Sequence, residues 1–313
     1  RRRLLDGGRA GVRRSALPAV IKLAVVLTLF VVAGSAPATT VVRAVDDAGT
    51  KIELARPATR IVSLAPHATE MLFAAGAGAA VVAVAAHSDH PPAARSLPRV
   101  ADAAMIDLEN VVALRPDLVV AWPYTAPNQL AALRALKIPV FFSHPRTMAS
   151  IAADVEKLGT LAGTPVPARQ AAEALRSRIA ALRRDYATPA PLSVFYEIWN
   201  RPLYTIGGDH LISEAIAVCG GRNIFAGLKL PAPEVNLEAV IAAAPQVIVG
   251  ADDAGARPVW LSEWSRWPDL PAVRDGNVIV ANGDLLHRPG PRFVEGVAEL
   301  CASLAQARAR ARR

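Results

Sequence analysis

One sequence phrase occurs twice in this chain, and it constrains the fold more than any other feature. Residues 107–120 read DLENVVALRPDLVV, and residues 236–249 read NLEAVIAAAPQVIV. The second copy begins 129 residues after the first (236 minus 107). Solenoid repeats are far shorter, at roughly 20–50 residues. The chain is therefore expected to contain two similar α/β lobes.

Each copy has the residues of a short helix followed by a buried strand. Asp107 and Asn236 stand at expected helix N-caps, because their side-chain oxygens can accept from the free N–H groups of the first turn. Pro116 and Pro245 end the helices, and an apolar run follows each of them. Two α/β lobes that face each other enclose a cleft, which is the usual place for a small ligand.

Residues 1–38 are predicted to be a signal peptide. Arginines precede a mostly apolar stretch at 20–33, and Ala36-Pro37-Ala38 fits the small-residue cleavage rule. A retained membrane anchor is the alternative, but the stretch is shorter than the roughly 20 apolar residues of a span, and Lys22 interrupts it. We expect a protein that is exported to the periplasm and soluble after cleavage of the leader.

Most of the positive charge belongs to this leader. The full chain has a formal net charge of +8, and the leader holds seven Lys/Arg and one Asp, a net of +6. A charge of +2 therefore remains for the rest of the chain (8 minus 6). Nucleic-acid binding requires a basic patch on the folded domain, so no nucleic-acid partner is expected.

The chain has two cysteines, Cys219 and Cys301. Because disulfides form and persist in exported proteins, we expect these two residues to be paired. On the chain-entropy model a disulfide that closes a loop of this length stabilises the fold by about 4–5 kcal/mol. Two buried free thiols are the alternative.

Strands and helices alternate along the chain after the leader. A β-hairpin is predicted at 40–54, and the later strands are apolar runs without polar alternation. Such runs are typical of parallel strands covered by helices on both faces. The predicted class is α/β, with two Rossmann-like lobes and mostly parallel central sheets. These later strands are expected at 61–64, 81–85, 118–121, 140–142, 193–196, 247–249 and 278–280.

Two helices rich in Ala, Arg and Leu are predicted at 148–162 and 168–186. The second is about 28 Å long by helix rise. It has no strand partner and ends before the break at Pro189-Ala190-Pro191, so we interpret this region as the connection between the lobes. One long helix there would resist large hinge motion, unlike flexible strand crossovers. The predicted organisation is an N-terminal lobe with its leading hairpin (39–146), a helical connection (147–190) and a C-terminal lobe (191–313).

Four motifs carry a resemblance to a known family: RIVSLAPHATE at 60–70, SDHPP at 88–92, DLE at 107–109 followed by LRPDLVVAW at 114–122, and CGGRNIF at 219–225. In their shared spacing they resemble the periplasmic cobalamin (vitamin B12) binding proteins of ABC importers. The resemblance covers nearly all of the chain after the leader. The wider group includes haem and ferric-siderophore binders, and its members have two α/β lobes joined by one long α-helix (class III periplasmic binding proteins).

The resemblance implies a binding protein that captures cobalamin or a related corrinoid and delivers it to an ABC permease and ATPase complex in the inner membrane. No catalysis, no cofactor and no metal are implied, and a monomer is expected. Glu109 and Glu238 match the acidic residues, one per lobe, that engage permease arginines. Stabilisation of the helix dipole, about 0.3–1 kcal/mol each, is the alternative role for these carboxylates.

The resemblance also implies a set of cleft residues. Ala103 and Ala232 stand where the best-known members carry Trp, so a roomier or less aromatic cleft is expected, and Trp199 and Tyr204 could compensate. The implied ligand-binding residues are Pro66, His87, Trp122, Asp284 and Arg288.

The residues support a cleft site without the resemblance. Pro66, His87, Trp122, Tyr124 and Asp284 all follow predicted strand ends, and ligands of open α/β sheets bind outside the carboxyl ends of strands. A large flat ligand suits aromatic faces with a few polar groups to orient it. Tyr124 is explained equally well by loop packing.

Other functions remain open. A haem or ferric-siderophore carrier of the same fold ranks second, and a divalent-metal binder that uses His87 and His90 with His67 and Asp284 ranks third. Pro91 and Pro92 keep the two histidines off one helical face. Solvated loop positions are the favoured explanation for His67, His90 and His287. No hydrolase, zinc-protease or phosphate-loop motif supports an enzyme.

Overall fold

The computed structural model describes residues 41–102, 105–123, 125–252, 256 and 258–311. The chain separates into two compact units, residues 1–38 and 39–313, and all described helices and strands belong to the second. The predicted signal peptide lies outside the described residues. Among the helices that are described, none is long and apolar enough to cross a membrane.

The first lobe is built on a five-stranded parallel sheet with the order β5-β4-β3-β6-β7. Its strands are short, and all but the edge strand β5 are mostly buried, which is why they read as apolar runs. An antiparallel hairpin, β1–β2, precedes the sheet as expected. The strands are β1 (Val42–Val45), β2 (Lys51–Leu54), β3 (Ile61–Ser63), β4 (Val81–Ala85), β5 (Arg99–Ala101), β6 (Leu118–Ala121) and β7 (Val140–Phe142). The helices are α1 (Pro66–Ala74), η1 (Gly78–Ala80), η2 (Pro92–Ser96), α2 (Leu108–Ala113) and α3 (Pro127–Ala135).

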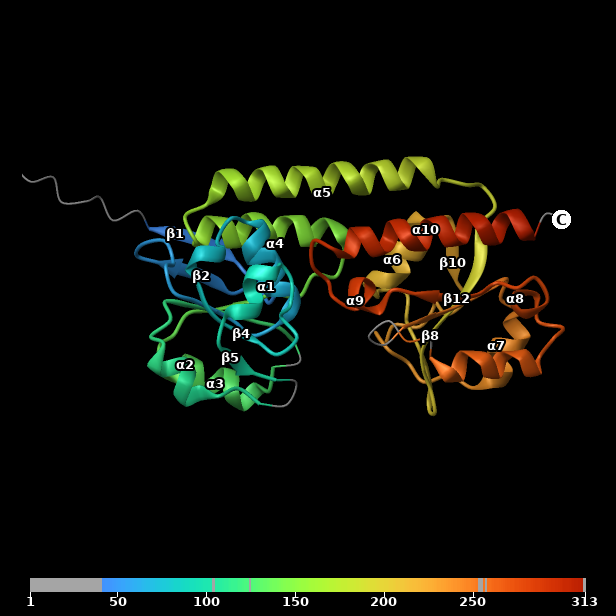
Figure 1. The fold of residues 1–313 in the computed structure, drawn as a ribbon, viewed down its shortest axis with the longest axis horizontal. Coiled ribbons are helices and arrows are strands. Elements are labelled where there is room, and N and C mark those ends of the chain that lie inside the picture. The colour runs from blue at the N-terminus through green and yellow to red at the C-terminus, as the bar shows by residue number, and fades with distance from the viewer. Residues whose placement is uncertain (1–40, 103–104, 124, 253–255, 257, 312–313) are drawn as a thin grey trace, which may run out of the picture. The chain divides into compact units, whose positions relative to one another are not determined.

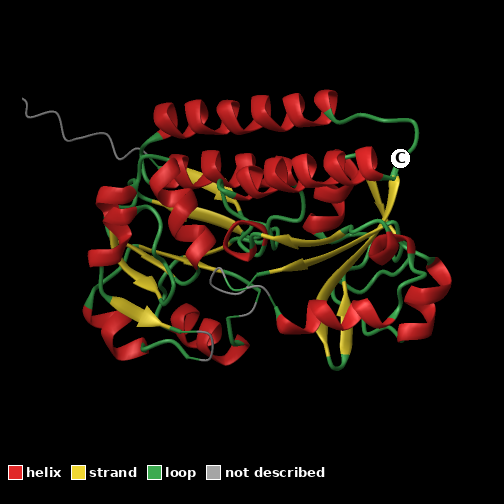
Figure 2. Cartoon of the chain, turned by 45° about the vertical axis from the view of Figure 1, so that its right-hand side comes forward, coloured by secondary structure: helices red, strands yellow, loops and turns green. Residues whose placement is uncertain are grey.

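The second lobe contains a sheet with the parallel order β10-β8-β11-β12, and β9 adds to β8 in the antiparallel direction. The prediction of two lobes with mostly parallel sheets is confirmed (Figure 2). The strands are β8 (Leu192–Asn200), β9 (Leu203–Thr205), β10 (Gly221–Asn223), β11 (Val247–Ala251) and β12 (Val278–Ala281). The helices are α6 (Leu211–Val218), α7 (Leu237–Ala243), η3 (Val259–Arg266), α8 (Pro271–Arg274) and α9 (Gly283–Leu286).

Three long helices lie together along one side of the molecule (Figure 1). They are α4 (Met148–Leu161), α5 (Pro165–Asp185) and α10 (Phe293–Arg310), and α5 packs against both of the others. At 21 residues, α5 is about 31 Å long. Thr147 and Ser150 form a reciprocal capping box that defines where α4 begins.

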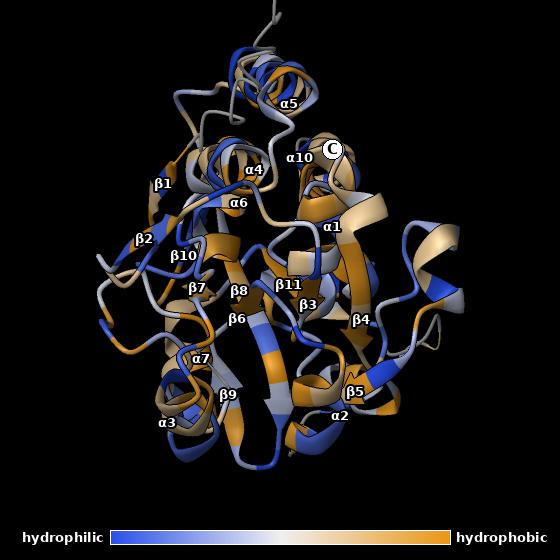
Figure 3. Cartoon of the chain, turned by 90° about the vertical axis from the view of Figure 1, so that its left-hand side faces the viewer, coloured by the Kyte–Doolittle hydropathy of each residue, from blue (hydrophilic) through white to orange (hydrophobic). Residues whose placement is uncertain are grey.

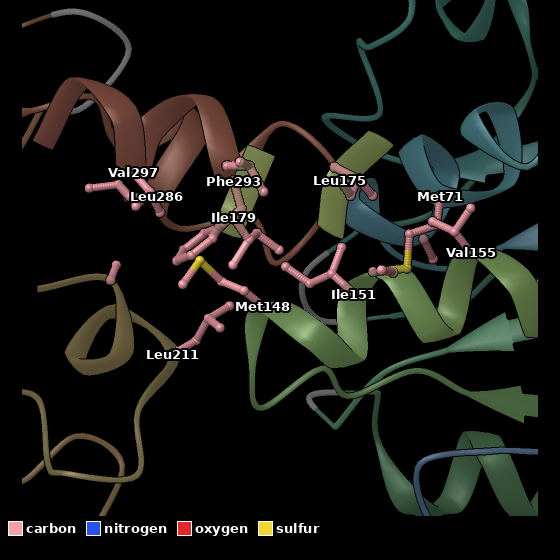
Figure 4. Packing of buried hydrophobic residues seen from close by; sticks show 14 of the residues in the cluster. Met71, Met148, Ile151, Val155, Leu175, Ile179, Leu211, Leu286, Phe293 and Val297 are labelled. Atoms are coloured by element: carbon pink, nitrogen blue, oxygen red, sulfur yellow. The ribbon is translucent and has the colours of Figure 1, made fainter. Parts of the chain in front are cut away.

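One hydrophobic cluster runs through both lobes by way of these helices. It includes Met71 of α1, Ile151 of α4, Ile179 of α5, Leu211 of α6 and Phe293 of α10. Figure 4 shows side chains from all five helices gathered in this cluster. The strands β3, β4 and β11 that face it are almost entirely apolar (Figure 3). Because a well-packed interior resists deformation, this shared core limits how freely the lobes can move.

The two copies of the repeated phrase fold alike. The Asp107 side chain accepts from the backbone N–H of Asn110 at 3.0 Å, and the Asn236 side chain accepts from that of Ala239 at 2.8 Å. Both N-cap predictions are therefore confirmed. The strands that follow, β6 and β11, are fully buried and take neighbouring places beside β3 and β8.

Three local patterns in the sequence predict something other than what forms. Residues 219–223, CGGRN, have the composition of a turn, but residues 221–223 form β10, because the parallel edge of β8 pairs with them. A last helix is expected from Gly290, but it begins at Phe293. Trp260, Trp264 and Trp267 have the spacing of one α-helical face that packs against the sheet, but Trp260 and Trp264 lie on a 3-10 helix, η3. All three tryptophans do pack into the second lobe.

Candidate functional site

Two predicted ligand residues lie at the carboxyl ends of neighbouring strands in the first lobe. Pro66 begins α1 after β3, and Trp122 follows β6 directly. Because β3 and β6 are paired in parallel, their carboxyl ends meet at the same edge of the sheet. Proline suits the first position of a helix, where the backbone N–H has no partner within the helix. Both side chains are half-buried.

His67 lies between these residues and the core. Its ring centroid is 5.3 Å from that of Trp122, with 53° between the ring planes. His67 is only 2 % exposed, so the expectation of a solvated histidine was wrong. The reason is that α1 begins at Pro66 and places His67 on the side of the helix that faces the core. Burial lowers the pKa of His67 to about 4, so the ring is neutral at neutral pH.

Four charged side chains form a chain of ion pairs between the lobes. Arg292 Nη2 donates to Glu70 Oε1 on α1 at 2.6 Å, and Arg292 Nη1 donates to Asp284 Oδ2 on α9 at 2.7 Å. Arg288 Nη2 lies 2.7 Å from Asp284 Oδ1, and Arg288 Nη1 donates to the carbonyl oxygen of His87 at 3.1 Å. We call Glu70, Arg292, Asp284 and Arg288 the interlobe charge network.

Exposure differs sharply along this network. The Glu70 side chain is 2 % exposed, that of Arg292 is 16 % exposed, and that of Asp284 is 48 % exposed. Gly290 lies against the Glu70 end, where an added Cβ would stand 3.1 Å from Glu70 Oε2. The network contains two acidic and two basic groups, so its net charge is zero. The buried negative charge of Glu70 is therefore compensated by Arg292, and the remaining pair also balances.

The two arginines also set the charge state of Asp284. Partial burial alone would raise the pKa of this carboxyl group. The hydrogen bond from Arg292 and the positive charges of Arg288 and Arg292 outweigh burial and hold the pKa below its ordinary value. Asp284 is therefore ionised at neutral pH and keeps about half of its side-chain surface open.

The structure brings five of the predicted ligand residues into one region. Arg288 joins two of the others, since it donates a hydrogen bond to the His87 carbonyl oxygen and forms an ion pair with Asp284. Pro66 lies on α1, the helix that contributes Glu70 to the network, and Trp122 packs on His67 of that helix. His87 is exposed and has a left-handed backbone with φ of 60°. Tyr124 lies outside the described residues.

Trp199 and Tyr204 form a separate pair on the β8–β9 hairpin. They are direct cross-strand partners, so their side chains share one face of the sheet. Trp199 is 54 % exposed, and its indole N–H donates to the Arg201 carbonyl at 3.0 Å. Among the described residues, no hydrogen bond or ring contact joins this pair to the interlobe charge network.

A fully buried tyrosine, which no sequence pattern indicated, contacts the residue next to Arg288. Tyr196, on β8, has its hydroxyl 3.0 Å from Nε2 of His287, the residue that ends α9. Burial raises the pKa of Tyr196, so the hydroxyl keeps its proton. The sequence could not reveal this hydrogen bond between Tyr196 and His287, because the two residues are 91 positions apart.

Glu109 and Glu238 occupy equivalent places in the two lobes. Each stands in the first turn of its helix, α2 or α7, and each is exposed. Within the described part of the chain, no hydrogen bond or ion pair reaches either carboxylate. Both helices lie at the end of the molecule opposite α5 (Figure 1).

Cys219 and Cys301 form a disulfide, as predicted. The bond joins the residue that ends α6 to the middle of α10, and both cysteines are completely buried. It thus connects the second lobe to one of the three long helices. Among the described residues, no three or more His, Cys, Asp or Glu side chains are grouped so that they could hold a metal ion.

Comparisons with known proteins agree on one family. The model of a family described as periplasmic binding protein matches residues 61–285. The curated vitamin B12-binding protein of Vibrio cholerae is 40% identical over 250 residues, which are 79% of this chain and 90% of that protein.

Solved structures give the same result. The crystal structure of the periplasmic vitamin B12 binding protein of Vibrio cholerae is 39% identical, with a TM-score of 0.72, over 80% of this chain and 98% of that chain. The periplasmic heme-binding protein from Roseiflexus sp. RS-1 is 25% identical, with a TM-score of 0.68, over 79% of this chain and 98% of that chain. These relatives are binding proteins rather than enzymes.

Proposed function

The chain belongs to the periplasmic binding protein family, and from this premise we propose that it is the substrate-binding component of an ABC importer for cobalamin or a related corrinoid. The observation that carries the proposal is the 40% identity to a vitamin B12-binding protein over most of both chains. The protein binds and releases its ligand unchanged.

The ligand is held between the lobes. Trp122 offers a flat apolar face for the corrin ring, and Pro66 adds a rigid apolar surface beside it. Asp284 and Arg288 supply the polar contacts from the second lobe, and His87 supplies them from the first. A binding site of this kind needs a large apolar surface and only a few polar groups that fix orientation. Tyr124, Trp199 and Tyr204 complete the proposed set.

The carboxylates of Glu109 and Glu238 dock onto the membrane permease. Three observations support this role: both are exposed, neither is paired within the described residues, and their helices, α2 and α7, lie at the same end of the molecule (Figure 1). Two equivalent carboxylates on two similar lobes match a permease with two-fold symmetry. The protein acts as a periplasmic monomer in this scheme.

A haem carrier is the second candidate, because a heme-binding protein of the same fold shares 25% identity with this chain. The corrinoid is favoured because the vitamin B12-binding protein shares 40% identity with this chain. The exposed Asp284 carboxylate can accept hydrogen bonds from a ligand with N–H or O–H donors.

The deciding experiment is a titration of the chain from residue 39 onward with cyanocobalamin, followed by tryptophan fluorescence, with haemin in parallel. We expect saturable one-to-one binding of cyanocobalamin alone, with quenching of fluorescence. If haemin binds and cyanocobalamin does not, the proposed ligand changes from a corrinoid to haem, and the proposed transport role is kept. If neither binds, the proposed ligand is wrong.

A further inference from the structure

Asp284 is held from two sides before any ligand arrives. Arg288 contacts one carboxylate oxygen and Arg292 the other, each at 2.7 Å. Arg288 is itself a proposed ligand residue, whereas the Arg292 side chain is only 16 % exposed and turns toward Glu70. In the proposed site, the ligand contacts the exposed part of Asp284, and Arg292 binds this carboxylate without contacting the ligand.

We propose that Arg292 and Glu70 are positioning residues for ligand recognition: Glu70 in the first lobe anchors Arg292, and Arg292 orients the Asp284 carboxylate toward the ligand. This inference rests on the proposed function and extends it to residues that do not touch the ligand. It also makes the polar part of the site depend on both lobes at once, because Glu70 and Asp284 lie on different lobes and share one guanidinium group.

The geometry requires arginine at this position. Arg292 uses Nη2 and Nε toward Glu70, at 2.6 and 3.1 Å, and Nη1 toward Asp284. A planar guanidinium group can serve two carboxylates in fixed directions, and a lysine ammonium group on its flexible chain does so far less well. Glu70 is almost fully buried, so packing fixes its position. The two hydrogen bonds to Glu70 in turn fix the position of the Arg292 guanidinium group.

Groups held in their bound orientation lower the entropic cost of binding. Loss of Arg292 leaves Asp284 with Arg288 as its only remaining ion-pair partner among the described residues, and the carboxylate is then free to follow Arg288 away from the ligand. Arg292 should therefore affect ligand affinity only while Asp284 is present. This dependence can be measured by combining substitutions of the two residues.

The test is a double-mutant cycle on cyanocobalamin affinity. Dissociation constants are measured for the wild-type chain, Asp284→Asn, Arg292→Lys and the double variant, with Arg292→Met as a second version of the arginine change. We expect each single variant to weaken binding about tenfold, and the double variant to bind within about twofold of Asp284→Asn alone. Independent effects would instead multiply to about a hundredfold.

A matched control separates positioning from general destabilisation. Arg178→Met removes an exposed arginine of α5 that lies 3.5 Å from Glu295 on α10, and should leave affinity unchanged. Glu70→Gln should weaken binding in the wild-type background but not in Asp284→Asn. Thermal unfolding of every variant shows which of them are folded at the assay temperature.

The outcomes distinguish failure of the proposed corrinoid-binding function from failure of the positioning role of Arg292 and Glu70. If wild-type protein does not bind cyanocobalamin, the proposed function fails and this inference fails with it. If wild-type protein binds and the effects of Arg292 and Asp284 multiply, or if Arg292→Lys and Arg292→Met bind normally while folded, only the inference is overturned.

Discussion

Glu214 on α6 accepts a hydrogen bond from the backbone N–H of Met148, the first residue of α4, at 2.8 Å. Its other carboxylate oxygen accepts from Arg183 on α5 at 2.6 Å. One side chain of the second lobe therefore satisfies a free N–H group of α4, a helix that packs against the first lobe. Together with the shared core, this contact makes the junction between the lobes stiff.

Glu214→Ala should lower the free energy of unfolding by about 1–3 kcal/mol, because a partly buried N–H group and a guanidinium group both lose their acceptor. Urea denaturation measures the change. Glu299→Ala, an exposed position on α10, is the control and should change stability by less than about 0.5 kcal/mol. Equal stability of Glu214→Ala and the control would contradict this role.

The free energy of unfolding should fall as pH rises from 4.5 to about 7, because buried Glu197 resists ionisation. Burial raises the pKa of Glu197 to about 7, even though the indole N–H of Trp264 donates to it at 2.6 Å. A raised carboxyl pKa favours the folded state below the ordinary value of 4.5, and this contribution is lost as pH rises through 7. The loss is about 3 kcal/mol between these limits.

Chemical denaturation between pH 4.5 and 8 tests this sign. Glu197→Gln cannot ionise, so its stability should not show the fall between pH 5 and 7. The fluorescence of Trp264 should titrate with a midpoint near pH 7 in the wild-type protein and not in the variant. A wild-type stability that rises over this range would contradict the assignment.

Loss of the disulfide should weaken the fold strongly. Cys219 and Cys301 are separated by 82 residues, and the chain-entropy model predicts a loss of about 4–5 kcal/mol when such a loop is opened. The Cys219→Ala/Cys301→Ala variant can be compared with wild-type protein in urea, with and without reductant. Reductant should destabilise the wild-type protein and leave the variant unaffected.

Trp122→Ala should weaken cyanocobalamin binding by about tenfold or more, because the proposed stacking surface is lost and an aromatic pair contributes about 0.5–1.5 kcal/mol beyond burial. Trp260→Ala, in the packed cluster of the second lobe, is the matched control. Affinity that is reduced equally in both variants would point to unfolding rather than to a lost ligand contact.

The Glu109→Ala/Glu238→Ala variant should bind ligand normally and fail to support uptake. The reason is that both carboxylates are exposed and unpaired within the described residues, so their removal leaves the fold and the ligand residues intact. Uptake of labelled cyanocobalamin by cells or by permease in vesicles measures the effect. Glu173→Ala/Glu299→Ala, which also removes two exposed acids, should transport normally.

Local and periodic features were predictable from the sequence. Asp107 and Asn236 act within their own helices, and the strands around Val119 and Val249 are apolar because both faces of the sheets are covered. Such features depend on residues a few positions apart, and sequence patterns record them. The disulfide was predictable for a different reason, since the chain offers only one possible pair.

The tertiary structure alone decided how the charged residues of the candidate site are paired. Glu70 and Arg292 are separated by 222 residues, and Arg288 and His87 by 201, so no local pattern could reveal these contacts. His67 was misassigned for the same reason: its burial depends on the packing of α1 against distant elements. Ion pairs and burial arise where the fold brings distant segments together, and a single sequence does not record those distances.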